Sequence, residues 1–156
     1  MQTTTGTLSE LTPDQRERVR ALGREVHFDA GERIFEEGTR ADRFWILHTG
    51  SATLAIHIPG HRDVAIDHVR HGELLGWSWM FPPYVWSLGA QADSPVRALE
   101  FDAQSVRVLC EEDKELGLAM TRSIAAVMGD RLQRSRSRLV DLFAPYAPQD
   151  RAAGAI

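Results

Sequence analysis

Cysteine is nearly absent from this chain, because Cys110 is the only one in 156 residues. A single cysteine cannot form a disulfide within the chain, so we expect a reducing, cytoplasmic compartment. No uninterrupted apolar run approaches the ~18 residues of a membrane-spanning helix. The polar start, MQTTTG, also lacks the basic and apolar blocks of a signal peptide. These absences predict a cytoplasmic protein that does not insert into a membrane.

A dominant sign of charge is also missing. The chain has 18 basic and 22 acidic residues, which gives a net charge of −4. The protein as a whole therefore does not attract nucleic acid or an anionic membrane, and such contacts would need a local basic patch. With 43% hydrophobic residues, the composition is that of one globular domain of ordinary size.

The hydrophobic pattern divides the chain into a flexible arm at residues 1–10, one domain at residues 11–143 and a flexible tail at residues 144–156. The first predicted helix covers residues 13–22. It begins at Thr12-Pro13-Asp14, which combines a cap, a proline at the first helical position and an acidic residue.

Short apolar stretches separated by glycine and proline turns occupy residues 25–102. This spacing is typical of a mainly β fold with flanking helices, and it predicts an antiparallel β-roll or jelly roll of about eight strands. Two helices are predicted to follow, a short one at residues 104–111 and a long one at residues 113–142. Gly117 and Gly129 are the expected weak points of the long helix.

The long helix carries two apolar stripes. The first consists of Leu116, Met120, Ile124 and Val127, and the second of Ala125, Met128, Leu132, Ser135, Leu139 and Leu142. Two apolar faces need two covering surfaces. The β-roll would cover the first. We expect a second copy of the helix to cover the other, giving a homodimer through Met128, Leu132, Ser135 and Leu139. The alternative is that both faces pack within one monomer.

Three arginines, Arg131, Arg134 and Arg138, share one face of this helix. Such a run is usually a solvated face, and contact with an acidic partner or RNA is the alternative.

Three glycine-containing motifs occur in order: FDAGERIFEEG at residues 28–38, DRFWILHTGSA at residues 42–52 and HGELLG at residues 71–76. In this order, the motifs resemble those of the cyclic-nucleotide-binding domain family, which includes bacterial catabolite-activator-type regulators and the sensing domains of kinases and channels. The resemblance covers roughly residues 10–143. It implies a β-roll that acts as a non-catalytic regulatory module and signals through its C-terminal helix.

By this resemblance, residues 71–76 begin the phosphate-binding cassette. The pocket would be lined by Gly72, Glu73, Leu74 and the amides of Leu75 and Gly76, with Glu73 accepting a ribose hydroxyl. Glycines let a main chain approach a ligand closely, and a short helix starting near Leu75 would direct its free N–H groups at an anion. The implied ligand is cyclic AMP, cyclic GMP or a related anion. The alternative is that Gly72-Glu73 is only a turn.

The chain departs from the family at the next strand, PYVWSLGAQA at residues 83–92. The family's nucleotide binders carry an arginine there that neutralises the cyclic phosphate. Its position falls on Val85 or Trp86, with Ser87 as a small hydrogen-bonding neighbour. A loss of ~3 kcal/mol is more than a hundredfold in affinity. The sequence therefore predicts weakened cyclic AMP binding.

Aromatic residues crowd the same insert: Trp77, Trp79, Phe81, Tyr84 and Trp86. They either line a ligand pocket or a docking surface, or pack on the barrel. We expect Trp77 or Trp86 nearest to any ligand. The insert also supports a second hypothesis, a ligand-free docking subunit of a larger complex.

Two further functions are not favoured. The histidines at positions 57, 61, 68 and 71 raise the idea of a metal-dependent β-roll enzyme, but the chain has no His-x-His pair and we expect no metal site. Bacterial regulators of the family carry a helix-turn-helix domain after the long helix. The residues after position 143 contain no helix pair, so we do not expect this chain alone to bind DNA.

Overall fold

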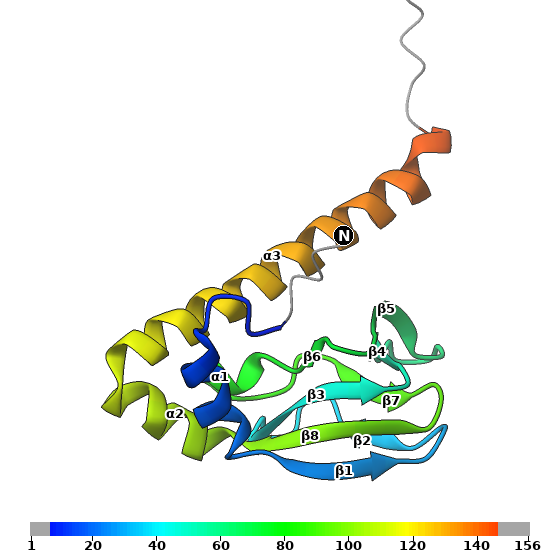
Figure 1. Ribbon diagram of the computed structural model, residues 1–156. Helices are drawn as coiled ribbons and strands as arrows, with labels where there is room; N and C mark the ends of the chain where they lie inside the picture. The colour runs from blue at the N-terminus through cyan, green and yellow to red at the C-terminus, as the bar shows by residue number, and fades with distance from the viewer. Residues whose placement is uncertain (1–6, 147–156) are drawn as a thin grey trace, which may run out of the picture.

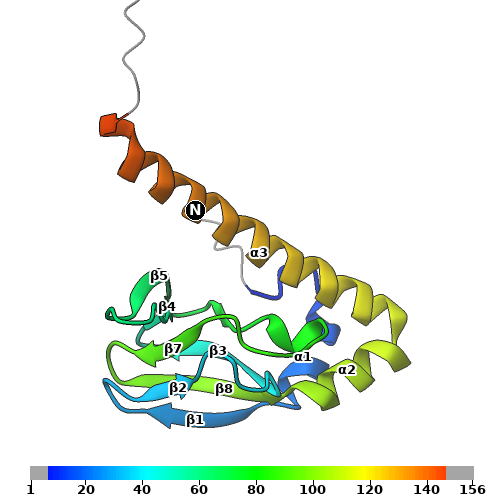
Figure 2. The same cartoon turned by 180° about the vertical axis from the view of Figure 1, so that it is seen from behind.

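Residues 7–146 are described by the computed structural model of the chain, and they form a β-roll flanked by three α-helices (Figures 1 and 2). The elements in chain order are α1 (Pro13–Arg20), β1 (Arg24–Phe28), β2 (Arg33–Phe35), β3 (Arg43–Thr49), β4 (Ala52–Ile56), β5 (Val64–Val69), β6 (Leu74–Leu75), the 3-10 turn η1 (Ser78–Met80), β7 (Gly89–Ala92), β8 (Val96–Asp102), α2 (Ala103–Glu112), α3 (Lys114–Phe143) and the 3-10 turn η2 (Ala144–Tyr146).

The strands form two four-stranded antiparallel sheets, with the orders β1-β8-β3-β6 and β2-β7-β4-β5. The predicted β-roll of about eight strands is confirmed. Strand residues alternate between the interior and solvent, as in β4, where Ala52 and Leu54 are buried between partly exposed neighbours. The inner faces of the two sheets therefore enclose one hydrophobic core.

Three aromatic rings close the helical end of this core. The ring of Phe44 stacks on Trp79 at 4.2 Å and on Phe101 at 4.7 Å between centroids, and all three side chains are fully buried. Trp79 is therefore a core residue, as one of the two interpretations of the aromatic insert predicted.

Helix α1 begins where the sequence predicted, with Thr12 and Gln15 forming a reciprocal capping box. It ends two residues earlier than expected, because the amides of Leu22 and Gly23 turn back to the carbonyls of Val19 and Arg20. Residues 7–10 belong to the segment that we expected to be a flexible arm, but they are in contact with the domain. Leu8 is buried in the core, so this segment packs on the domain.

The expected arm at residues 1–6 and most of the expected tail lie outside the described residues.

Helix α3 runs unbroken through both of its glycines, which confirms the single long helix predicted for residues 113–142. Gly117 is required by the packing of α2 against α3, because a Cβ there would lie 2.4 Å from the carbonyl oxygen of Cys110. The absent side chain lets α2 and α3 approach closely. Asp113 caps α3 by accepting the amide of Leu116.

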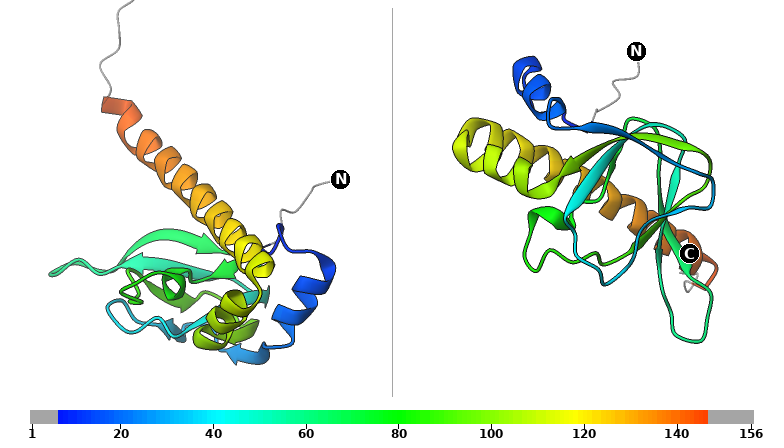
Figure 3. Two further views of the ribbon diagram at one scale, coloured as in Figure 1. Left: turned by 90° about the vertical axis from the view of Figure 1, so that its left-hand side faces the viewer. Right: turned by 90° about the horizontal axis from the view of Figure 1, so that it is seen from below.

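The two stripes of α3 differ in their surroundings. Leu116, Met120 and Ile124 of the first stripe are fully buried against the domain. In the second stripe, Leu132 and Leu139 are each 54% exposed. The last turns of α3 extend away from the roll (Figure 3, left). Within residues 7–146, no helix is long and apolar enough to cross a bilayer.

Candidate ligand-binding site

The cassette turn is built by main-chain hydrogen bonds to β3. The amide of Gly72 donates to the carbonyl of Leu47 at 2.6 Å, and the amide of Leu47 donates to the carbonyl of Glu73 at 3.1 Å. The amide of Glu73 donates to the carbonyl of Arg70 at 3.1 Å, and the Glu73 carboxylate accepts the amide of Arg70 at 3.0 Å. The amides of Gly72 and Glu73 are therefore already occupied by the protein.

The short helix predicted to start near Leu75 is not formed. Leu74 and Leu75 instead form β6, which pairs with Ile46 and Trp45 of β3, and the following turn η1 is only three residues long. Both leucines are fully buried, so core packing holds this segment as a strand. Without that helix, the cassette presents no helix N-terminus to an anion.

The side chain of Trp86 fills the interior of the roll next to the cassette. Its ring stacks on Phe35 at 4.0 Å and is 4% exposed. A Cβ on Gly76 would lie 2.5 Å from the Trp86 ring, so only glycine allows this contact. Val85, in contrast, is 39% exposed and lies in an isolated bridge with Arg40. Of the two positions proposed for the missing arginine, Trp86 points inward and Val85 does not.

The predicted site residues divide between two cavities. Gly72, Glu73 and Leu74 line an outer cavity of about 420 Å³. An inner cavity of about 40 Å³ is lined by others of the predicted set, namely Gly76, Trp77, Trp86 and Ser87. The remaining two, Leu75 and Val85, line neither cavity.

The outer cavity lies between the cassette and α3. Thr7 comes from the N-terminal segment and donates its hydroxyl to the carbonyl of Gly72 at 2.7 Å. Across the cavity, Ser123, Arg131 and Arg134 come from α3. An occupant would therefore contact the cassette and the long helix together. At about 420 Å³ the space is within the range of small-molecule sites.

Arg131 connects the two cavities, because it lines both. Its side chain is only 11% exposed and donates through Nη2 to the carbonyl of Leu74. Burial lowers the pKa of Arg131 from its ordinary value, and the nearby Asp67 carboxylate opposes that shift. The expectation of a solvated arginine face is therefore wrong for Arg131.

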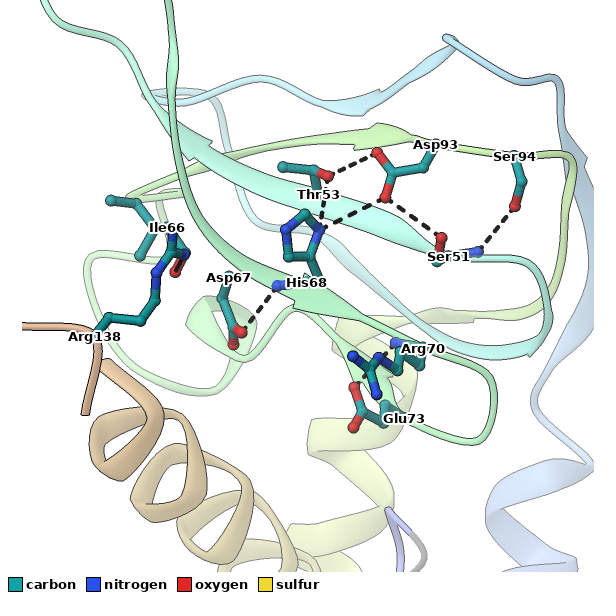
Figure 4. A network of polar contacts seen from close by, with 10 residues as sticks. All are labelled: Ser51, Thr53, Ile66, Asp67, His68, Arg70, Glu73, Asp93, Ser94 and Arg138. Carbon is teal, nitrogen blue, oxygen red and sulfur yellow. Dashed lines mark hydrogen bonds and ion pairs between the residues drawn. The ribbon is translucent and has the colours of Figure 1, made fainter. Parts of the chain in front are cut away.

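Asp67 on β5 faces this arginine pair. Its Oδ2 lies 3.7 Å from Nε of Arg131 and 3.4 Å from Nη2 of Arg134. Its Oδ1 accepts the amide of His68 at 2.9 Å (Figure 4). Oδ2 of Asp67 and both arginine Nε atoms are buried without a hydrogen-bond partner among residues 7–146.

The sequence analysis missed Arg131 as a site residue, although a signal was present. Arg131 follows Val127 by four positions and therefore continues the buried stripe of α3.

His57 and His68 are exposed, and residues 7–146 contain no group of three His, Cys, Asp or Glu side chains suited to a metal ion. His68 instead joins an exposed network on the outer face of β4 and β5, where Thr53 donates to Asp93 at 2.6 Å and lies 3.0 Å from Nδ1 of His68 (Figure 4).

Comparison with known families decides the classification. The sequence model of the family described as "Cyclic nucleotide-binding domain" matches residues 25–113, more than half of the chain. The chain belongs to the cyclic nucleotide-binding domain family. The resemblance inferred from the three motifs is confirmed.

Relatives of this cyclic nucleotide-binding domain include regulators. The CRP-like cAMP-activated global transcriptional regulator of Mycobacterium tuberculosis is 25% identical over 123 residues, which are 79% of this chain and 53% of the relative. The chain thus spans about half the length of that relative.

Solved structures support the same fold. A protein from Geobacter metallireducens, described as a cyclic nucleotide-binding protein, matches with a TM-score of 0.72 and 26% identity over 81% of this chain and 91% of its own. A cyclic nucleotide-binding domain from Methylobacillus flagellatus matches with a TM-score of 0.76 and 16% identity over 84% and 74% of the two chains. At this lower identity, the match shows the fold alone.

This cyclic nucleotide-binding domain does not fit a cyclic nucleotide held in the pose that the family resemblance implies. The indole of Trp86 occupies one candidate position of the phosphate-binding arginine, and the other, Val85, is directed away. The amides of Gly72 and Glu73 are bonded to main chain. Of the two cavities that the predicted site residues line, the larger lies against α3.

Proposed function

We propose that this domain is a non-catalytic, cytoplasmic regulatory module that binds a small anionic, nucleotide-like ligand between its cassette and α3. The observation that carries the proposal is the outer cavity of about 420 Å³, which has Gly72 and Glu73 on one wall and Arg131 and Arg134 on the other. The arginines favour an anion, and the volume suits a molecule of nucleotide size.

The position of α3 gives such a ligand a route to regulation. Its first half is anchored by Leu116, Met120 and Ile124, whereas its last turns extend beyond the roll. A ligand that touches both the cassette and the helix would favour the helix position in which both contacts are made. Binding would thereby change what the exposed part of α3 presents to a partner.

Calorimetric titration combined with thermal melting tests this proposal. Cyclic AMP, cyclic GMP and related dinucleotides would be added to the wild-type chain. A ligand at 100 times its Kd stabilises the folded state by about 2.7 kcal/mol through mass action, which gives a clear rise in Tm. Absence of binding across this set, together with no small molecule copurifying, would overturn the proposal.

A ligand-free docking subunit is the second candidate, because the Trp86 ring already occupies the roll interior. Docking would use the exposed part of the aromatic insert, where Phe81 is 41% exposed, and not the buried Trp79. A stoichiometric partner that is lost with Phe81→Ala and retained with Val108→Ala, an equally exposed residue on α2, would favour this function.

We also propose a homodimer through the second stripe of α3. Leu132 and Leu139 are exposed there at helical spacing, while Met128 and Ser135 are half-buried beside them. A second copy of the helix would cover this stripe symmetrically.

A further inference from the structure

Two arginines of α3 converge on one carboxylate at the edge of the outer cavity. Arg131 and Arg134 both approach Oδ2 of Asp67, at 3.7 and 3.4 Å. These are ion-pair distances without hydrogen bonds, since Oδ2 and both Nε atoms are unbonded among the described residues. One carboxylate oxygen thus faces two guanidinium groups and satisfies neither fully.

Within residues 7–146, this arrangement leaves Arg131 with one hydrogen bond, to the carbonyl of Leu74, and with an ion pair that is only partial. Arg131 is 11% exposed, so its charge has lost most of its contact with water. A buried charge is tolerated when it is both paired and fully hydrogen-bonded. Asp67 provides partial pairing only, and Asp130 pairs with Arg134 at 3.4 Å from a largely exposed position.

Three arginines and three carboxylates surround the outer cavity, so a phosphate has to compete with a carboxylate for the arginines. Arg70, Arg131 and Arg134 line the cavity with Glu73 and Asp130, and Asp67 lies 3.7 and 3.4 Å from Arg131 and Arg134. Glu73 is engaged with the amide of Arg70. A phosphate group offers several acceptor oxygens, and planar guanidinium groups bind phosphate through paired hydrogen bonds.

We propose that Arg131 and Arg134 of α3 replace the arginine missing from the strand after the cassette, and bind the phosphate of a nucleotide-sized ligand in the outer cavity. Asp67 holds the two guanidinium groups when no ligand is present, and the phosphate displaces it. This inference rests on the proposed function and names its binding groups. The phosphate contact then lies on the helix that transmits the signal.

The experiment compares wild type with Arg131→Met, Asp67→Asn and Arg138→Gln by calorimetric titration at fixed ionic strength. The probes are cyclic AMP, cyclic GMP and inorganic pyrophosphate. Arg131→Met removes the charge and keeps an unbranched apolar side chain in its place. Arg138 is the matched control, because it lies two turns further along the same helix and is exposed, with its guanidinium on the carbonyl of Ile66.

We expect Arg131→Met to weaken binding about tenfold or more, as the loss of a charge-assisted hydrogen bond does. Asp67→Asn should strengthen binding severalfold, because the phosphate no longer competes with a carboxylate. Arg138→Gln should stay within about twofold, since Arg138 is exposed and does not line the outer cavity, and exposed charges are screened by salt. The gain with Asp67→Asn cannot arise from misfolding, so it keeps the test decisive if Arg131→Met is unstable.

The outcomes separate the two proposals. If a cyclic nucleotide binds and neither Arg131→Met nor Asp67→Asn changes its affinity, the arginine assignment is wrong and the proposed function stands. If only pyrophosphate binds, in an Arg131-dependent way, the assignment stands and the nucleotide-like ligand is wrong. If no probe binds to wild type, both are overturned.

Discussion

The ring of Trp86 packs on Gly76 so closely that a Cβ at position 76 would lie 2.5 Å from its Cη2 atom. Gly76 also has a φ of +94°, which side-chain-bearing residues rarely adopt. The resemblance to the family implied that this glycine lets the main chain approach a ligand. Here the same freedom admits a tryptophan, which explains how the cassette sequence is present while the roll interior is full.

Substituting Gly76 tests this contact. We expect Gly76→Ala to lower the free energy of unfolding by about 2–5 kcal/mol, from backbone strain and from displacement of the indole. Gly60→Ala is the control, because Gly60 has a φ of +78° but no heavy atom within 4 Å of a Cβ. It should lose only about 1–2 kcal/mol. Equal losses in urea denaturation would show that Trp86 moves aside easily.

The outward position of Val85 leads to a second prediction. Introducing Val85→Arg would place a guanidinium on the surface beside Arg40, outside both cavities. We therefore expect no gain of cyclic AMP binding by calorimetry, and a melting temperature close to that of wild type. New micromolar binding in this variant would show that position 85 faces the pocket.

The sequence predicted the β-roll well because the fold depends on local patterns. Alternating burial in β4 and the cap at Thr12 are set by neighbouring residues. The site depends on distant ones. Trp86 is held by Phe35 from another strand, and Arg131 reaches the carbonyl of Leu74. No local spacing encodes those contacts, although the stripe ending in Val127 indicated that Arg131 faces inward.

Glu100 on β8 supports a third prediction. Its carboxylate is buried, and it accepts hydrogen bonds from Arg24 at 2.7 Å and from Nε1 of Trp45 at 3.0 Å. We expect Glu100→Ala to lower the free energy of unfolding by about 1–3 kcal/mol, because the buried indole N–H loses its acceptor. Urea denaturation measures the loss.

The control for this variant is Glu25→Ala. Glu25 pairs with Arg97 on the same sheet at 3.4 Å, but both side chains are more than half exposed. Such a pair contributes about 0–1 kcal/mol. Similar losses in Glu25→Ala and Glu100→Ala would mean that the burial of Glu100 has no energetic consequence.

The start of α3 supports a prediction about pH. The pKa of Asp113 lies below its ordinary value of 3.8. The largest cause is a hydrogen bond from the Arg18 guanidinium, and the second is a hydrogen bond from the amide of Leu116. A lowered folded-state pKa contributes stability that is present above the unfolded-state pKa and is lost as the pH falls through the folded-state value. Wild type should therefore lose stability below a pH of about 4.

Asp113→Asn removes this titration and keeps a side chain that can cap the helix. We expect the variant to be less stable than wild type at neutral pH, and the difference to shrink as the pH falls below the ordinary pKa of 3.8. Urea unfolding at a series of pH values measures both. Parallel curves for the two proteins would contradict a role of the Asp113 charge in acid stability.

The dimer proposal connects to the site through two adjacent residues. Arg131 faces the cavity, and Leu132 follows it on the exposed stripe of α3. Consecutive helical residues point about 100° apart. A phosphate that shifts α3 through Arg131 would therefore shift the stripe at Leu132 with it, because both residues belong to the same helical turn.

Light scattering with size-exclusion chromatography tests this stripe. We expect wild type at twice the chain mass of 17.5 kDa, and Leu132→Asp as a monomer, since a charge in an apolar helix interface is left unpaired. Val140→Asp adds the same charge at a position that is 64% exposed and lies off the stripe, so it should remain dimeric. A monomeric wild type, or a dimer that survives Leu132→Asp, would overturn the interface.

The same measurement with pyrophosphate added tests whether the cavity and the stripe are coupled through α3. We expect the dimer of wild type to weaken or tighten, and the dimer of Arg131→Met to show no such response.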